Sequence, residues 1–106
     1  MDFVYVLKEV EVWEADNILS IHKTYEGACT AWYTRRDMEI AFYTENIKDI
    51  AREMKNSHRS ISQAIDDTAL IQKYESDVER MKRLKPEDTL DIDGRRLIIE
   101  KIEVLE

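Results

Sequence analysis

The side chains capable of acid–base, metal or covalent chemistry in this sequence are mostly carboxylates, since 23 of the 106 residues are acidic. They are accompanied by two histidines and one cysteine. A zinc site needs several Cys or His ligands at short spacings, and neither His22 nor His58 has such neighbours. We therefore predict no metal and no cofactor, and we interpret Cys29 as a small residue buried on a helix face.

Catalysis by a known motif is also disfavoured. The sequence contains no G-x-G-x-x-G, P-loop, H-E-x-x-H or G-x-S-x-G pattern, and its two glycines are too few for a phosphate-binding loop. A pair of carboxylates can act as acid and base when their environments separate their pKa values. An acid-rich chain forms many such pairs by chance, so we predict a non-catalytic protein and leave a catalytic pair as an open alternative.

The acidic residues around Trp13 are the first candidate binding site. Alternation in the first strand predicts that Glu9 and Glu11 face solvent, and Glu14 and Asp16 occupy the turn that follows. Trp13 does not share the alternation of Val10 and Val12, so the pattern does not place its side chain on the face that those valines would bury. We expect these residues to bind a basic surface on another protein, where the carboxylates imitate nucleic-acid phosphates. The alternative is an ordinary solubilising surface.

Two tyrosines form a second candidate site. The helix expected from Tyr25 carries one apolar stripe that includes Trp32, and Tyr33 and Ile40 mark a second apolar face. Either the sheet and a later helix bury both faces, or Tyr33 and the pair of Phe42 with Tyr43 contact another molecule, because aromatic residues anchor interfaces.

The remaining helices follow from caps and periodicity. Thr24 can cap the helix that begins at Tyr25, and the apolar spacing after Thr44 predicts a separate short amphipathic helix. Ser60 and Gln63 form an S-x-x-Q capping box, so we expect a long helix over about 60–84 that ends before Pro86. This helix is longer than a small domain needs, and the helix expected from Tyr25 has a second apolar face to bury. Together these two features predict a homodimer.

The carboxyl-terminal segment predicts a β-hairpin. Asp93-Gly94 is typical of a two-residue type I′ turn, which places Leu90 opposite Leu97 and the residues between them in register. Farther on, Ile102 and Val104 have the opposite parity to Leu97. Either both faces of the sheet are covered there, or a bulge near residues 100–101 resets the pleat.

These elements predict an α+β fold in the order ββαααββ. Residues 3–12 and 18–22 form a first hairpin around a turn at residues 14–17, and the two hairpins join in one antiparallel sheet packed on one side by helices. A chain of 106 residues with 43% hydrophobic residues is sufficient for a single domain, 1–106, with one core.

Charge and composition indicate the setting. The net charge of −7 is spread along the chain, which disfavours nucleic-acid binding because that needs a clustered positive surface. A nucleic-acid binder using Arg35, Arg36, Arg95 and Arg96 remains the third hypothesis. The sequence has no apolar run long enough to span a bilayer, no signal peptide and no cysteine pair, so we expect a cytoplasmic protein with no membrane partner.

One resemblance adds to this interpretation. The segments VYVL and ILSIHKTYEGA at the start, with DGRRLIIEKIEV at the end, resemble small phage- or prophage-encoded proteins of uncharacterised function. The resemblance covers the two ends of the chain and assigns no functional residues. It implies a protein of the bacterial host cytoplasm that inhibits a host defence protein. The alternative is a self-associating structural or adaptor protein.

Overall fold

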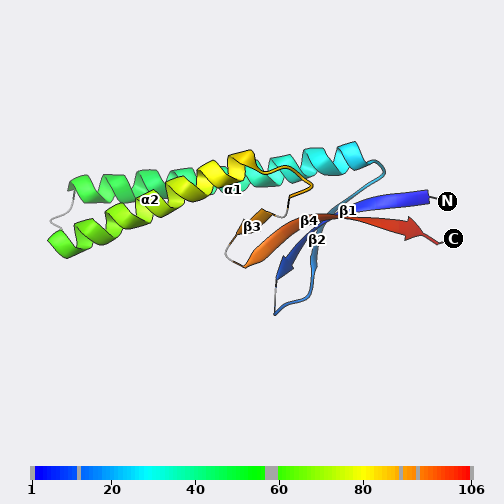
Figure 1. Cartoon of the computed structure of the whole chain (residues 1–106), viewed down its shortest axis with the longest axis horizontal. Coiled ribbons are helices and arrows are strands. Elements are labelled where there is room, and N and C mark those ends of the chain that lie inside the picture. Colours follow the sequence, from blue (N-terminus) through cyan, green and yellow to red (C-terminus); the bar gives the residue numbers. More distant parts are fainter. Residues whose placement is uncertain (1, 12, 57–59, 89, 93, 106) are drawn as a thin grey trace. The chain divides into compact units, whose positions relative to one another are not determined.

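The computed structural model describes residues 2–11, 13–56, 60–88, 90–92 and 94–105. Its elements in chain order are β1 (Asp2–Glu11), β2 (Asn17–His22), α1 (Tyr25–Asn56), α2 (Ile61–Arg83), β3 (Leu90–Ile92) and β4 (Arg95–Val104) (Figure 1). The predicted α+β class is confirmed. The predicted order ββαααββ is wrong, because α1 is a single helix where two were expected.

The side chain of Thr44 explains why α1 does not break. Its hydroxyl donates a hydrogen bond to the carbonyl of Ile40 at 2.8 Å, one turn earlier in the same helix. A threonine bonded in this way continues a helix, whereas a capping threonine bonds to backbone N–H groups that follow it. Since neither proline nor glycine occurs between Ala28 and Asn56, nothing else interrupts the 32 residues of α1.

Two of the three predicted helix starts, those after Thr24 and at Ser60, are confirmed. At α1, the Gly27 N–H donates to Thr24 Oγ1 at 3.0 Å. At α2, Ser60 and Gln63 make both bonds of the capping box: the Gln63 N–H donates to Ser60 Oγ, and the Ser60 N–H donates to Gln63 Oε1, each at 3.2 Å. The helix that follows, Ile61–Arg83, matches the expected span of about 60–84.

The two predicted hairpins form one antiparallel sheet with strand order β2-β1-β4-β3. The central contact is the β1–β4 pair, which runs without a break from Asp2 opposite Val104 to Glu11 opposite Arg95. The β1–β2 pair is irregular between Leu7 and Lys8. Because β1 and β4 are both central, their alternating side chains have two faces to fill.

The register of the carboxyl-terminal hairpin is confirmed. Leu90 lies opposite Leu97 and Ile92 lies opposite Arg95, as the Asp-Gly turn required. Gly94 has a φ of 83°, a conformation that favours glycine. Asp93, the other central residue of the predicted type I′ turn, lies outside the described residues.

The positive φ of Gly94 leads to a first prediction. We expect Gly94→Val to lower the free energy of unfolding by more than about 1 kcal/mol, because a β-branched residue is strained at positive φ. Space is not the cause, since no atom lies within 4 Å of the position that a Cβ would take. Gly94→Asn is the matched control, because asparagine tolerates this conformation. Urea denaturation measures both variants, and equal midpoints for valine and wild type would contradict the prediction.

The end of β4 matches neither of the two alternatives predicted for it, a bulge or coverage of both faces. The unbroken β1–β4 register leaves no bulge near residues 100–101. Ile102 and Val104 therefore do lie on the face opposite Leu97, but that face is not covered there: the two side chains are 40% and 43% exposed. At this end of the sheet, the described part of the chain thus leaves apolar side chains exposed to solvent.

Contacts within the chain separate it into two units, Met1–Arg36 with Leu84–Glu106 and Asp37–Arg83. In the first unit, Trp32 is fully buried and its Nε1–H donates to the carbonyl of Leu97 at 3.3 Å, which fixes α1 on one face of the sheet. In the second unit, the ring of Tyr43 contacts Tyr74 at 5.2 Å between centroids. That the chain is a single domain stays a prediction.

Candidate functional site

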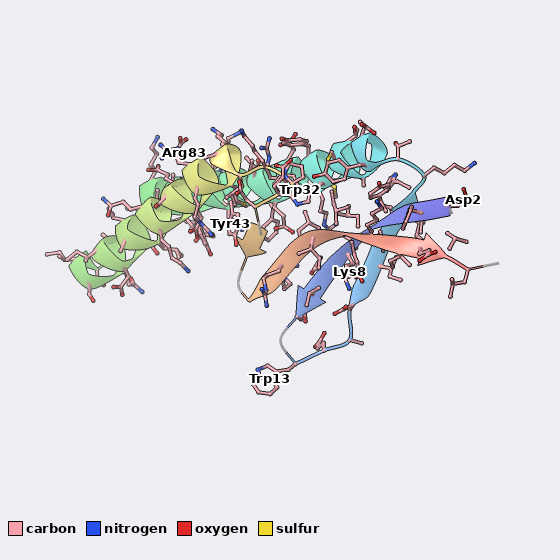
Figure 2. The ribbon with its side chains drawn as sticks, turned by 45° about the vertical axis from the view of Figure 1, so that its right-hand side comes forward. Asp2, Lys8, Trp13, Trp32, Tyr43 and Arg83 are labelled. Atoms are coloured by element: carbon pink, nitrogen blue, oxygen red, sulfur yellow. The ribbon has the colours of Figure 1, made fainter. Side chains whose placement is uncertain are left out.

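The turn between β1 and β2 carries Trp13, which is almost fully exposed, whereas Trp32 is fully buried. Trp13 is 94% exposed, and Figure 2 shows its ring at the end of the hairpin, away from the strands. We refer to Glu11, Trp13, Glu14, Ala15 and Asp16 as the hairpin tip. An indole left in water contributes nothing to the protein's own core, and aromatic side chains of this kind are enriched at protein interfaces.

Two carboxylates of the hairpin tip lie close together. A hydrogen bond between the side chains of Glu11 and Glu14 raises the pKa of Glu11, and desolvation and the negative charge of Glu14 raise it further. The backbone brings these residues together, since the Glu14 N–H donates to the carbonyl of Glu11 at 3.5 Å. A cation placed near both carboxylates would offset the repulsion between them.

The third acid of the hairpin tip is already paired within the chain. Asp16 Oδ2 accepts a hydrogen bond from Lys8 Nζ at 2.9 Å, and Lys8 also forms an ion pair with Glu100. The two carboxylates, Glu100 first and Asp16 second, raise the pKa of Lys8. Asp16 therefore helps to hold the turn, so its charge is less available to a partner than those of Glu11 and Glu14.

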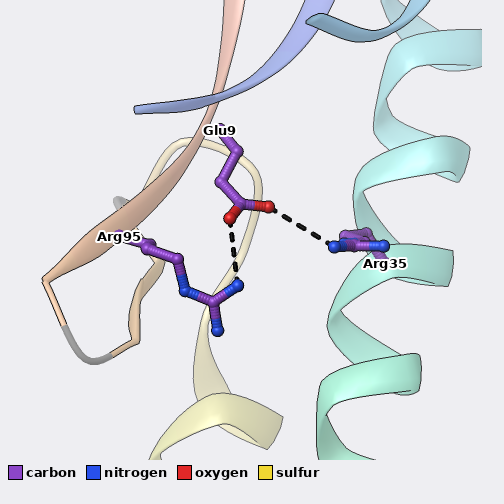
Figure 3. Close-up of polar contacts among 3 residues, drawn as sticks. All are labelled: Glu9, Arg35 and Arg95. Atoms are coloured by element: carbon purple, nitrogen blue, oxygen red, sulfur yellow. Dashed lines mark hydrogen bonds and ion pairs between the residues drawn. The ribbon is translucent and has the colours of Figure 1, made fainter. Parts of the chain in front are cut away.

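Glu9 does not belong to the hairpin tip, and the prediction that it faces solvent is wrong. Its side chain is only 13% exposed. Glu9 Oε1 accepts a hydrogen bond from Arg95 Nη1 at 3.0 Å, and its Oε2 accepts one from Arg35 Nη2 at 3.4 Å (Figure 3). Glu9 shares its sheet face with Tyr5, whose ring contacts Tyr25 of α1. The carboxylate is thus on the face that α1 covers, where it links β1 to β4 and to the helix.

The two predicted tyrosines have different environments. Tyr33 is partly exposed, with an edge contact to Trp32 at 5.2 Å and the guanidinium of Arg36 4.8 Å from its ring centre. Tyr43 is 6% exposed, so the prediction that it offers surface to another molecule is not supported by its position, whereas the neighbouring Phe42 is exposed. Tyr33 and Tyr43 belong to different units, and neither is part of the hairpin tip.

Three of the four arginines of the nucleic-acid hypothesis have acceptors within the protein, and the fourth, Arg96, is exposed. Arg35 and Arg95 converge on Glu9, and Arg36 donates to the carbonyl of Leu84 at 3.2 Å. Phosphate binding would have to compete with these contacts. The arrangement favours a structural role for these three side chains.

The residues considered for metal or covalent chemistry have ordinary settings. His22 Nε2 is hydrogen-bonded to Ser20 Oγ at 2.7 Å, and His58 lies outside the described residues. Cys29 is half-buried rather than buried, and its hydrogen bond with Tyr25 is the main cause that raises the pKa of the tyrosine to about 12. The described part of the chain holds no cluster of three or more His, Cys, Asp or Glu residues suited to a metal ion.

Neither α1 nor α2, the helices that the structure describes, has an apolar stretch of the length needed to cross a bilayer. Comparison of the sequence and structure with models of protein families, with curated proteins and with solved structures found no match. The site must therefore be interpreted from its own geometry.

Sequence reasoning missed one group of residues. Lys8, Asp16 and Glu100 form a small ion cluster on the sheet face opposite α1. A signal for it was present: Lys8 has the parity of Val6 and Val10, so its charge interrupts an otherwise apolar face and needs partners there. The partner Glu100 is distant in sequence and was not predicted.

Proposed function

We propose that this protein is a small acidic, non-catalytic protein that binds another protein through its hairpin tip. The observation that carries the proposal is the indole of Trp13, 94% exposed beside the paired carboxylates of Glu11 and Glu14. Interfaces of known energetics are commonly anchored by one or two such aromatic residues, with charges around them that set orientation. The hairpin tip has both components in one turn.

The chemistry of the hairpin tip favours a basic partner surface. A lysine or arginine between Glu11 and Glu14 would offset the repulsion between the two carboxylates. A catalytic role for the same pair is less favourable, because acid–base carboxylates need a cleft that excludes water, and this pair lies on an open turn.

The resemblance to phage- and prophage-encoded proteins supports a specific setting for this partner. We place the protein in the cytoplasm of a bacterial host, where it inhibits a host defence protein by occupying a basic surface that otherwise meets nucleic acid. The negative net charge of −7 is consistent with such a target.

Self-association as a structural or adaptor protein is the second candidate function. It is favoured by an open apolar groove on α2 that is lined by Ile61, Ala64, Ile65, Thr68, Ala69 and Gln72. Ile61 and Ile65 are both exposed in this groove, and a second copy of the chain would remove them from water.

Affinity capture from bacterial lysate with the Trp13→Ala variant tests the first candidate. We expect wild-type protein to retain one basic partner and Trp13→Ala to lose it, with an affinity at least about 100-fold weaker, because the variant removes the central anchor. Mass spectrometry identifies the retained protein, and titration calorimetry with that purified protein gives the affinity.

The matched control for this experiment is Ile61→Ala, which removes an apolar side chain that is 83% exposed on α2 in the other unit. We expect it to capture the same partner as wild type does. If Trp13→Ala and Ile61→Ala capture the partner equally well, the hairpin tip is not the binding site.

A further inference from the structure

Among the residues that the structure describes, no strand lies beside the outer edge of β4 over most of its length. On one side, β1 pairs with all ten residues of β4. On the other side, β3 pairs only with Arg95, Arg96 and Leu97. From residue 98 to 104, no strand of the described chain lies on this second side, and residues 100–105 are all exposed. Backbone N–H and C=O groups along this stretch are therefore available to an added strand.

Charged residues on edge strands usually oppose such pairing. This stretch contains Glu100, Lys101 and Glu103, which alternate with apolar residues. Whether these charges oppose or favour an added strand depends on the charges opposite them, because like charges directly across a strand pair are destabilising and opposite charges are stabilising. An added strand would therefore be stabilised if its charges were opposite in sign to those that they face on β4.

A second copy of β4 meets that condition in one register. Two copies related by a two-fold axis pair antiparallel, and each residue then lies opposite a partner residue of the same parity. Pairing centred on residue 100, 101 or 103 would place a charged residue opposite itself. Pairing centred on Ile102 places Ile102 opposite Ile102 and forms two equivalent pairs of Lys101 with Glu103.

The side chains of β4 are positioned for this register. Lys101 and Glu103 lie on the same face of the sheet, and Lys101 Nζ is 4.1 Å from the centre of the Phe3 ring on that face. Ile102 and Val104 lie on the opposite face and are both exposed, and a neighbouring strand would bury part of each side chain. Charge and apolar surface would both gain partners from the same pairing.

We propose that two copies of this chain associate through their β4 edges, antiparallel and centred on Ile102, so that two four-stranded sheets become one continuous sheet. The partner at this edge is a second copy of the chain, because the order of charges is complementary to itself. The inference does not rest on binding at the hairpin tip, which lies on a different part of the sheet, at the β1–β2 turn.

Charge reversal with sedimentation equilibrium tests the pairing. We expect wild type to be a dimer at high micromolar concentration. We expect Lys101→Glu and Glu103→Lys each to raise the dimer dissociation constant about tenfold or more, because each turns two attractive pairs into two repulsive ones. The double variant, which carries both changes, restores opposite charges and is expected to dimerise as wild type does.

The double variant also separates pairing from a local effect. Lys101→Glu loses the contact with Phe3 in both the single and the double variant. Position 103 lies opposite Phe3, so urea denaturation of each variant measures any local effect, and recovery of the dimer without a matching recovery of stability reports pairing between copies. Glu103→Lys keeps the lysine that contacts Phe3. If circular dichroism shows that Lys101→Glu does not fold, the dimer dissociation constant of Glu103→Lys tests the pairing instead. Lys48→Glu, at an exposed position of α1, is the control for net charge.

Three results would overturn the proposal: a monomeric wild type, a dimer that both single variants leave unchanged, or a double variant that stays monomeric. A dimer that neither single variant weakens would indicate association through another surface, such as the groove on α2. Trp13→Ala is expected to leave the dimer intact, so the proposals for the hairpin tip and for the β4 edge fail separately.

Discussion

Trp32→Ala is expected to lower the free energy of unfolding by about 3 to 5 kcal/mol, the largest stability effect that we predict for this chain. Trp32 is fully buried between α1 and the sheet, and its Nε1–H donates to the carbonyl of Leu97. Alanine would remove the packing of the whole indole and leave that carbonyl without its side-chain donor. Since domains of this size are stable by about 5 to 15 kcal/mol, such a loss would remove a large part of the total stability.

Urea denaturation followed by far-ultraviolet circular dichroism measures this effect. Trp32→Phe is an intermediate case, because it keeps an aromatic ring but removes the donor. The other tryptophan is the matched control: Trp13→Ala is expected to change stability by less than about 0.5 kcal/mol, because the side chain is exposed. Similar midpoints for the two alanine variants would show that Trp32 does not hold α1 on the sheet.

The second large effect concerns binding at the hairpin tip. We expect Glu11→Lys combined with Glu14→Lys to weaken binding to a basic partner more than about 100-fold, because two attractive charges become repulsive. Asp16 is left unchanged in this design, since a lysine there would repel Lys8, which Asp16 now pairs with. Calorimetry with the captured partner measures the affinity, and unchanged binding at physiological salt would exclude an acidic interface at this turn.

The same contact predicts the direction of a pH dependence. Because the pKa of Glu11 is raised by its hydrogen bond with Glu14, Glu11 gains a proton at a higher pH than an isolated glutamate does. Lowering the pH through this range removes negative charge from the hairpin tip, so affinity for a basic partner should fall. The charge-reversed variant lacks both carboxylates and should not show this dependence.

Much of the fold was predictable because it depends on short-range chemistry. The Asp-Gly turn set the register of Leu90 with Leu97, and the caps at Thr24 and Ser60 set the starts of α1 and α2. Each of these features needs bonds or dihedral angles within a few residues, so residue types at short spacing are sufficient to specify them. Thr44 was the exception, because its hydroxyl can cap a helix or bond backwards within one.

The candidate site was predictable only in part. Trp13, Glu11 and Glu14 were identified by parity and turn position, and the structure places them together at the hairpin tip. Glu9 has the same charge and the same parity as Glu11, yet its carboxylate lies under α1 with two arginines. For Tyr43 the sequence left two alternatives open, burial within the chain or contact with another molecule, and the side chain is buried, because the aromatic ring of Tyr74, distant in sequence, packs against it.

The difference between these outcomes has one physical cause. Alternation of residues in a strand specifies which side chains share a face, and the sequence of β1 alone contained that information. It does not specify which face a helix will cover, since Val6 and Leu7 point to opposite faces and both are buried. Only tertiary packing, with the Trp32 indole donating to the carbonyl of Leu97, placed α1 on the face of Glu9 and left Ile102 and Val104, at one end of the other face, exposed to water.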